Sequence, residues 1–201
     1  MLWKSQLHEN IRDIEFRNPP VIIRVNKFNE ESAKEFAQKI SEAHNTGQKV
    51  IPVIIDSYGG EVYSLMSMIS SIKSSTIPIA TIVEGKAMSC GVILFSCGTK
   101  GYRYITEDAT LMIHDVSSGE WGKNAEIQAG AKEVNRLNEK IYQILSENSK
   151  KSEKWFNKKI NKKGRADWYI EAQEAIDLGL ADKIGMPKLE LKVSLDIDIK
   201  E

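Results

Sequence analysis

This sequence lacks the features that define several large classes of protein. Its only cysteines, Cys90 and Cys97, lie in one apolar segment and are too few for a disulfide framework. No apolar run reaches the roughly 20 residues that a membrane-spanning helix needs, and residues 1–10 lack the apolar core of a signal peptide. We therefore expect a cytoplasmic protein with two reduced thiols and no membrane partner.

An excess of charge of either sign is also missing. Lysine and arginine together number 28, as do aspartate and glutamate, so the formal net charge is zero. Composition therefore gives no support for a nucleic-acid partner, which usually selects a basic protein. The sequence has no repeats and no low-complexity tracts, and 201 residues fit a single domain over residues 1–201 with a short N-terminal segment of about 1–19.

Apolar segments alternate with helix-like segments over most of the chain. We predict strands over residues 21–26, 50–55, 79–83 and 110–114. We predict helices over residues 30–44, 61–73, 89–96, 124–148, 153–160 and 171–178. This alternation is typical of an α/β protein with a mainly parallel sheet. Pro52 places its strand at a sheet edge or a bulge, and the alternating tail 189–199 predicts a further edge strand.

The predicted helix 124–148 is charged except for one apolar stripe. Val134, Leu137, Ile141 and Leu145 recur at spacings of three, four and four. Such a stripe needs a partner surface, which is either the sheet of the same chain or another subunit.

Ser89 lies between a predicted strand and a predicted helix, in the sequence Ala-Met-Ser-Cys-Gly. A nucleophilic serine on a tight turn requires small neighbours of this kind. The free N–H groups at the start of the helix would then face an oxyanion. A serine in this place is more often only a helix N-cap, and these five residues alone favour that interpretation.

Two other segments carry candidate chemistry. His114 ends the apolar strand 110–114 and is either a general base, since imidazole titrates near neutral pH, or a strand-end residue that bonds a carbonyl. Gly59 and Gly60 follow the second strand and allow positive φ angles with exposed N–H groups. They form either an ordinary turn or an oxyanion hole.

Four blocks in this order resemble the proteolytic subunit of Clp protease. They are IDSYGG at 55–60, AMSCG at 87–91, MIHD at 112–115 and ADWYIEAQEAIDLGLAD at 166–182, with the long helix before the last. The resemblance spans about residues 21–184. Members of this family typically have NSPGG, ASMGA, MIHQP and a block ending in EAxxxGLVD. Because four ordered blocks rarely match by chance, the functional interpretation of each becomes the preferred one.

The resemblance implies a catalytic triad. Ser89 would be the nucleophile, His114 its base and Asp167 the group that orients the imidazole. By itself Asp167 is more often a residue that caps a following helix. The backbone N–H groups of Gly60 and Cys90 would form the oxyanion hole. This chemistry needs no cofactor and no metal ion.

The resemblance also implies where a peptide binds. Gly59, Glu61 and Val62 would lie on one side of the substrate, and Asp115 and Val116 on the other. An extended peptide would be added between them as a strand.

The expected architecture is the fold shared by Clp protease and crotonase, built of repeated β-β-α units with a mainly parallel sheet. A long handle helix would protrude within a handle region of about 116–161. The implied assembly is a homo-oligomer of stacked heptameric rings that cleaves unfolded polypeptides, with an AAA+ unfoldase as a possible partner.

The sequence departs from the family pattern at specific positions. Tyr58 stands where the family has proline, and Asp56 replaces the usual asparagine. Ala166 occupies the place of an arginine that joins contacts between rings, and Arg165 lies one residue earlier.

Three other functions remain open. The first is an enzyme like a signal-peptide peptidase, in which Lys86 or Lys100 would activate Ser89. The second is a non-catalytic ring or scaffold component that kept the fold. The third, an acyl-CoA hydratase of the crotonase type, ranks last because it gives the three triad residues no joint role.

Overall fold

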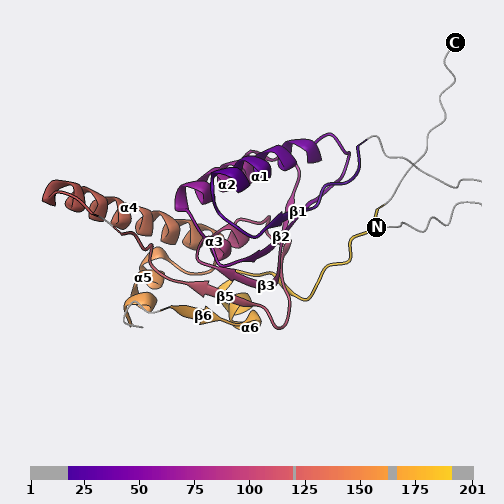
Figure 1. Ribbon diagram of the computed structural model, residues 1–201. Helices are drawn as coiled ribbons and strands as arrows, with labels where there is room; N and C mark the ends of the chain where they lie inside the picture. The colour runs from indigo at the N-terminus through magenta and orange to yellow at the C-terminus, as the bar shows by residue number, and fades with distance from the viewer. Residues whose placement is uncertain (1–17, 120, 163–166, 192–201) are drawn as a thin grey trace, which may run out of the picture.

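Seven strands form one sheet, and six helices pack on or beside it in the part of the chain that the structure describes (Figure 1). This computed structural model describes residues 18–119, 121–162 and 167–191. The strands are β1 (Ile23–Val25), β2 (Ile51–Ser57), β3 (Ile79–Met88), β4 (Arg103–Ile105), β5 (Thr110–Ile113), β6 (Trp168–Ile170) and β7 (Lys183–Ile184). The helices are α1 (Glu30–Ala43), α2 (Val62–Ser74), α3 (Cys90–Ser96), α4 (Asn124–Asn148), α5 (Glu153–Lys162) and α6 (Ala172–Leu178).

The sheet is parallel except at one edge. Its main path runs β1-β2-β3-β4-β7, and all these neighbours pair in parallel. Strand β5 also pairs with β3 in parallel, and β6 joins β5 antiparallel. The predicted α/β class with a mainly parallel sheet is therefore confirmed.

Strand β3 organises the sheet because it serves two partners along one edge. Its residues Thr81–Val83 pair with β4, and its last residues, Lys86–Met88, pair with β5. Strand β5 thus begins where β4 no longer follows β3. This arrangement brings the carboxyl end of β5 beside the carboxyl end of β3.

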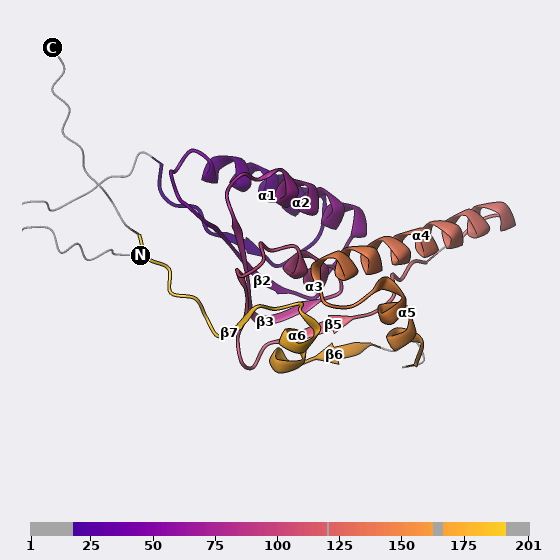
Figure 2. The same ribbon diagram turned by 180° about the vertical axis from the view of Figure 1, so that it is seen from behind.

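Helices α1 and α2 lie side by side along one side of the sheet, whereas β6, α5 and α6 gather at its other end (Figures 1 and 2). Helix α1 begins at a capping box. The Ser32 N–H donates to Asn29 Oδ1 at 2.8 Å, and the Asn29 N–H donates to Ser32 Oγ at 3.0 Å. Phe36 and Ile40 are then on the buried face of the helix.

Helix α3 is buried at every one of its residues. A helix that is apolar on all sides belongs inside a core, and the segment Val92–Phe95 is accordingly almost free of solvent contact. Its first residue directly follows Ser89, so the core fixes the helix that carries this serine.

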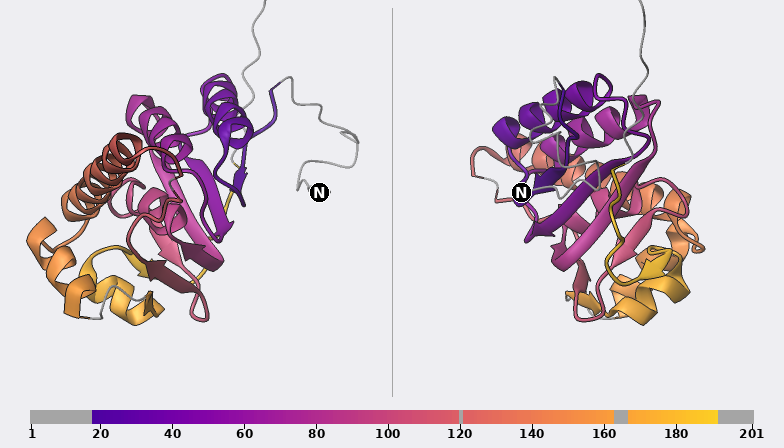
Figure 3. Two further views of the ribbon diagram at one scale, coloured as in Figure 1. Left: turned by 60° about the vertical axis from the view of Figure 1, so that its left-hand side comes forward. Right: turned by 90° about the vertical axis from the view of Figure 1, so that its right-hand side faces the viewer.

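Helix α4 has the predicted bounds and two different halves. Its second half buries Leu137, Ile141 and Leu145 of the predicted stripe against the chain itself, while Val134 is half-buried. Its first turns, residues 124–129, are exposed. Figures 1 and 2 show this end projecting beyond the body of the molecule, and the left view of Figure 3 shows the helix above α5, with which it is in contact.

An ion pair with few solvent contacts fastens β4 to the residue just before β7, and the same arginine contacts the end of α4. Arg103 Nη2 lies 2.6 Å from Asp182 Oδ1, and Arg103 Nε donates to Asp182 Oδ2 at 2.9 Å. Arg103 Nη1 also donates to the carbonyl of Asn148 at 2.6 Å, at the last turn of α4. One guanidinium thereby connects β4, the end of α4 and the residue that precedes β7.

Two sequence-based expectations need correction. Strand β2 lies between β1 and β3, so Pro52 is not at a sheet edge, and the irregularity in β2 lies between Ile55 and Ser57 instead. The proline is tolerated because pairing with β1 starts only at Val53, so no partner requires the missing N–H.

The proposed tail strand is also not found where it can be checked. Residues 189–191 are not in a strand. The remainder of that segment, 192–199, lies outside the described residues, as do Arg165, Ala166 and nearly all of the N-terminal segment 1–19.

Candidate active site

Ser89 stands at a strained turn between β3 and α3. Its φ of 54° and ψ of −119° make it the only non-glycine residue with positive φ in the described part of the chain. A residue in such a region costs about 1–3 kcal/mol and persists only where its surroundings enforce it. Here the Ser89 N–H donates to the carbonyl of Met112 at 2.9 Å, which ties the turn to β5.

The simpler interpretation of Ser89 as a helix cap is not supported. Its side chain makes no capping hydrogen bond to α3. The side chain instead lines a pocket of about 240 Å³ together with His114.

Strand register brings the three predicted triad residues together. Met88 pairs with Met112 in parallel, so Ser89 and His114 follow the ends of adjacent strands. Ile113 pairs with Trp168 antiparallel, so the next step of that ladder places His114 opposite Asp167. Ser89 and Asp167, which are 78 positions apart in the sequence, are thus connected through His114 by two strand pairings.

The imidazole and the carboxylate face each other without a hydrogen bond. His114 Nδ1 lies 3.7 Å from Asp167 Oδ1, beyond the usual N–H···O range of about 2.7–3.2 Å. Among the described residues, no hydrogen bond joins Ser89 Oγ to the imidazole either, although both side chains line the same pocket. Catalytic hydrogen bonds are often long in a free enzyme and shorten when substrate binds.

Gly59 is required by a close approach to Ser89. Its φ is +104°, and a Cβ at this position would lie 2.7 Å from Ser89 Cβ and 3.2 Å from Ser89 Oγ. Gly60 has a φ of +152°, and a Cβ there would lie 2.4 Å from the carbonyl oxygen of Phe28. Neither position can hold a side chain without moving the backbone.

The glycine turn also meets the start of α3. The Cys90 thiol donates to the carbonyl of Gly60 at 3.2 Å, and both residues line the pocket with Ser89. Burial raises the pKa of Cys90 to about 11, so this residue stays a thiol at neutral pH and is not a competing nucleophile. The predicted oxyanion-hole residues are therefore next to the predicted nucleophile.

A sequence model of the family described as Clp protease matches residues 12–188. The chain belongs to the Clp protease family. The match covers the strands, helices and turns that build this pocket, and membership implies a peptidase.

The departure of this Clp protease sequence at Tyr58 has a structural counterpart. Lys86 Nζ lies 2.8 Å from Asp56 Oδ1 and 4.5 Å from the centre of the Tyr58 ring. The chain thus braces the turn before Gly59 by an ion pair and a cation–π contact, whereas proline would restrict the turn covalently. The two replacements are visible in the sequence, but nothing there indicates that Lys86 connects them.

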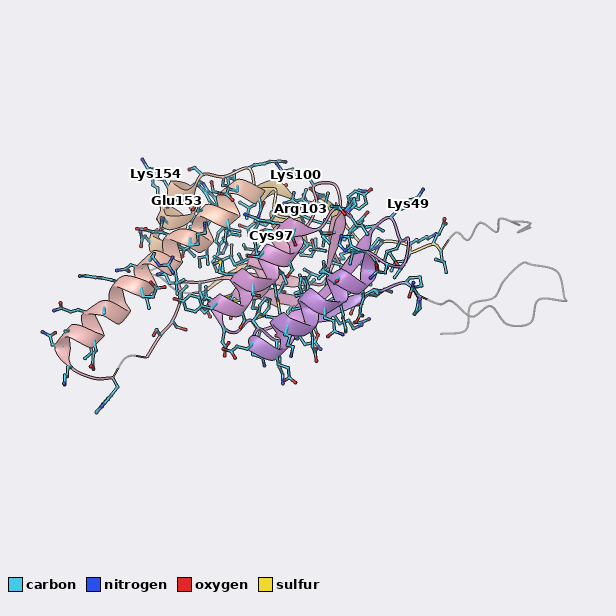
Figure 4. All side chains as sticks on the ribbon, turned by 90° about the horizontal axis from the view of Figure 1, so that it is seen from above. Lys49, Cys97, Lys100, Arg103, Glu153 and Lys154 are labelled. Carbon is cyan, nitrogen blue, oxygen red and sulfur yellow. The ribbon has the colours of Figure 1, made fainter. Side chains whose placement is uncertain are left out.

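The same contacts bear on the Ser–Lys alternative. The hydrogen bond that the Lys86 ammonium donates to Asp56 raises the pKa of Lys86, so the free amine that a general base requires is even scarcer at neutral pH than for an ordinary lysine. Lys100 is near the opposite end of β3, because the Thr99 N–H donates to the carbonyl of Ile79, the first residue of that strand (Figure 4). The geometry therefore favours His114 as the base.

Helix α4 holds the segment that follows His114. The Tyr142 hydroxyl donates to the Asp115 carboxylate, and the Val116 N–H donates to Asn138 Oδ1 at 2.7 Å. Neither helix residue was predicted to belong to the site, although their spacing of four places them on one face of the helix. They brace the strand end that carries the candidate base.

Two of the residues predicted to bind the peptide have backbone N–H groups that are already hydrogen-bonded inside the chain. The Glu61 N–H donates to the carbonyl of Phe28 at 2.8 Å, and the Val116 N–H is bonded to Asn138. Val62, the other predicted contact on the first side, is half-buried and lines the pocket. A substrate strand would need to pair with the other polar groups of these segments or to exchange these bonds.

The remaining wall of the pocket is apolar. It is lined by Val62, Leu65, Ile93, Ile113 and Ile141. Such a wall suits an apolar side chain next to the reacting bond.

None of the helices in the described residues is both long and apolar enough to cross a membrane. Within the same residues, no group of three histidine, cysteine or carboxylate side chains is placed to hold a metal ion.

Proposed function

We propose that this chain is a serine endopeptidase that uses Ser89, His114 and Asp167 as a catalytic triad. The observation that carries the proposal is the strand register, which aligns His114 with Asp167 on one side and with the strained Ser89 turn on the other. A triad is recognised by such geometry and not by chain order.

In the proposed mechanism, His114 Nε2 accepts the proton of Ser89 Oγ as that oxygen attacks the peptide carbonyl carbon. Asp167 accepts a hydrogen bond from Nδ1–H and so selects the tautomer whose Nε2 is free. The backbone N–H groups of Gly60 and Cys90 donate to the oxyanion. The imidazolium then protonates the leaving amine, and water releases the acyl group by the reverse proton transfers.

The separation of 3.7 Å between His114 and Asp167 must shorten for this mechanism. We propose that assembly and substrate binding provide this change, because the segment after His114 is fixed to α4 and α4 extends away from the body.

The projecting end of α4 is the proposed contact between copies in a homo-oligomer of stacked heptameric rings. Trp121 is fully exposed and Ile127 is 43% exposed at this end. Exposed apolar groups of this size are typical of surfaces that another protein covers. An AAA+ unfoldase that delivers the polypeptide is a further proposed partner.

We propose unfolded polypeptides as substrates, since an extended chain can lie between the segment 59–62 and the segment 115–119. The apolar pocket wall would accept an apolar residue on the acyl side of the cleaved bond.

A fluorophosphonate probe tests the nucleophile directly. It should label the wild-type chain at Ser89, and Ser89→Ala should lose both labelling and cleavage of a fluorogenic peptide. Ser70→Ala, an exposed position on α2, is the matched control and should retain both. Unchanged cleavage in Ser89→Ala would remove the proposal, and retained cleavage in His114→Ala would favour the Ser–Lys enzyme. No labelling at all would favour a non-catalytic component.

A further inference from the structure

Helix α5 and the residues just before it carry a local excess of positive charge in an otherwise neutral chain. Six lysines and one acidic residue, Glu153, occur between Lys150 and Lys162. The buried face of α5 is formed by Phe156 and Ile160. The exposed charges of the helix therefore lie on the opposite, outward face.

Three lysines form a regular row on that face. Lys154, Lys158 and Lys162 are all exposed and follow one another at intervals of four residues. An α-helix rises about 6 Å over four residues, so the ammonium groups can repeat at about that spacing. Figure 4 shows Lys154 at the periphery of the molecule, clear of the sheet.

The row is not neutralised by neighbouring acids. The ion pairs between described residues involve Arg24, Lys86, Arg103, His114 and Arg136, and none includes a lysine of α5. Asn157 and Asn161 lie between the lysines, and these five side chains border a shallow depression. The lysine ammonium groups can attract the negative charges of another molecule, and the asparagine amides beside them can bond to a polypeptide backbone. This combination suits an acidic polypeptide.

Other lysines of the same segment have a different task. Lys159 Nζ lies 5.1 Å from the centre of the Trp168 ring, and Lys151 Nζ lies 5.3 Å from that of Trp155. These two ammonium groups cover aromatic rings within the fold. The exposed row of Lys154, Lys158 and Lys162 can therefore contact another molecule.

We propose that the outward face of α5, defined by Lys154, Asn157, Lys158, Asn161 and Lys162, is a docking site for extended acidic polypeptide segments. In an extended peptide, alternate side chains point the same way and repeat at about 6.6 Å. Alternate carboxylates therefore match a row of ammonium groups spaced by about 6 Å, and the two asparagines can bond the peptide backbone between them.

A nucleic acid fits this face less well. Single strands are usually held by aromatic rings that stack on bases. On α5, Phe156 is buried, and the half-buried Trp155 ring is covered by the ammonium groups of Lys151 and Lys159. The face offers charge and amides but no open ring.

Binding is measured with the full chain carrying Ser89→Ala, so that no peptide is cleaved and the result does not depend on the proposed peptidase activity. The probe is a fluorescein-labelled peptide of alternating glutamate and serine, and its matched control has glutamine in place of glutamate. Fluorescence anisotropy gives the Kd of each at several salt concentrations. We expect binding of the acidic peptide only, weakening as salt is raised.

The variant Lys154→Gln/Lys158→Gln/Lys162→Gln should weaken this binding by about tenfold, because three exposed charge contacts are lost. The matched control, Lys34→Gln/Lys49→Gln/Lys100→Gln, removes the same charge from exposed positions elsewhere and should bind like the parent. Circular dichroism and thermal unfolding verify that both variants fold. Light scattering verifies that their particle mass is unchanged.

Four results would overturn the proposal. The first is a Kd for the acidic peptide in the α5 variant equal to that of the parent chain. The second is an equal loss of affinity in both lysine variants, and the third is tighter binding of a labelled single-stranded oligonucleotide than of the acidic peptide. The fourth is a changed particle mass in the α5 variant, which would identify this face as a contact between copies.

Discussion

Replacing Gly59 by alanine should impair catalysis much more than folding. The new Cβ would lie 2.7 Å from Ser89 Cβ, roughly 1 Å closer than carbon atoms normally approach. The glycine turn or the serine must move by a comparable amount. A misplacement of about 1 Å can cost on the order of 100-fold in rate, so we expect kcat for peptide cleavage to fall by about that factor.

The effect on stability should be smaller. A non-glycine residue at the φ of +104° found here costs about 1–3 kcal/mol, which is less than the stability of a typical domain, about 5–15 kcal/mol. The variant should therefore fold, and urea denaturation can measure the loss. Peptide cleavage and the rate of fluorophosphonate labelling report separately on the position of the Ser89 hydroxyl.

Gly47→Ala is the matched control for backbone strain. Gly47 also has positive φ, +75°, but a Cβ there would meet no atom within 4 Å. This variant should lose stability without losing activity. Wild-type kcat in Gly59→Ala, or an equal loss of activity in both variants, would refute the inferred contact between the turn and the nucleophile.

Four other outcomes follow from contacts described above. Arg103→Met should destabilise the fold by about 3–5 kcal/mol in urea denaturation, because it leaves the Asp182 carboxylate without its partner; an unchanged midpoint would contradict this. Burial disfavours the charged form of Asp182, but the hydrogen bonds and the charge of Arg103 outweigh burial and lower the pKa of Asp182 in the folded chain. The ionised carboxylate therefore contributes its full stabilisation above about pH 4, the pKa of an unfolded aspartate, and this stabilisation is lost as the pH falls through the lower folded pKa. The loss of stability on the acid side should disappear in Arg103→Met. Lys86→Met should lower kcat several-fold with little change in KM, and Tyr58→Pro in the same chain should restore part of it if the lysine acts by bracing the turn. Tyr142→Phe should also lower kcat by releasing Asp115, whereas an unchanged pH–rate profile and kcat would show that this contact does not position His114.

Sequence patterns predicted the long elements well because each has a strong local signal. The Asn29 capping box and the stripe at Leu137 and Ile141 depend only on neighbouring residues, and α1 and α4 are confirmed close to the expected bounds. Strands β4, β6 and β7 were not predicted, since two or three residues are too few to show a period.

The site could be predicted only in part for a related reason. Ser89 and His114 were recognisable from short blocks, but their meeting depends on pairing between β3 and β5, which is a long-range property. The contacts of Asn138 and Tyr142 depend on how α4 packs, which the helix pattern does not specify. The link between Lys86 and Tyr58 likewise requires the register of β2 and β3.

The strained backbone at Ser89 has a consequence for the cell that makes this protein. The unusual angles at this residue are enforced by a completed sheet on one side, through Met112, and by the buried helix α3 on the other. A chain still emerging from the ribosome has neither constraint, and its serine would relax to an ordinary conformation. The capacity to cut other proteins should therefore arise only with the finished fold, which protects the surrounding proteome from immature copies.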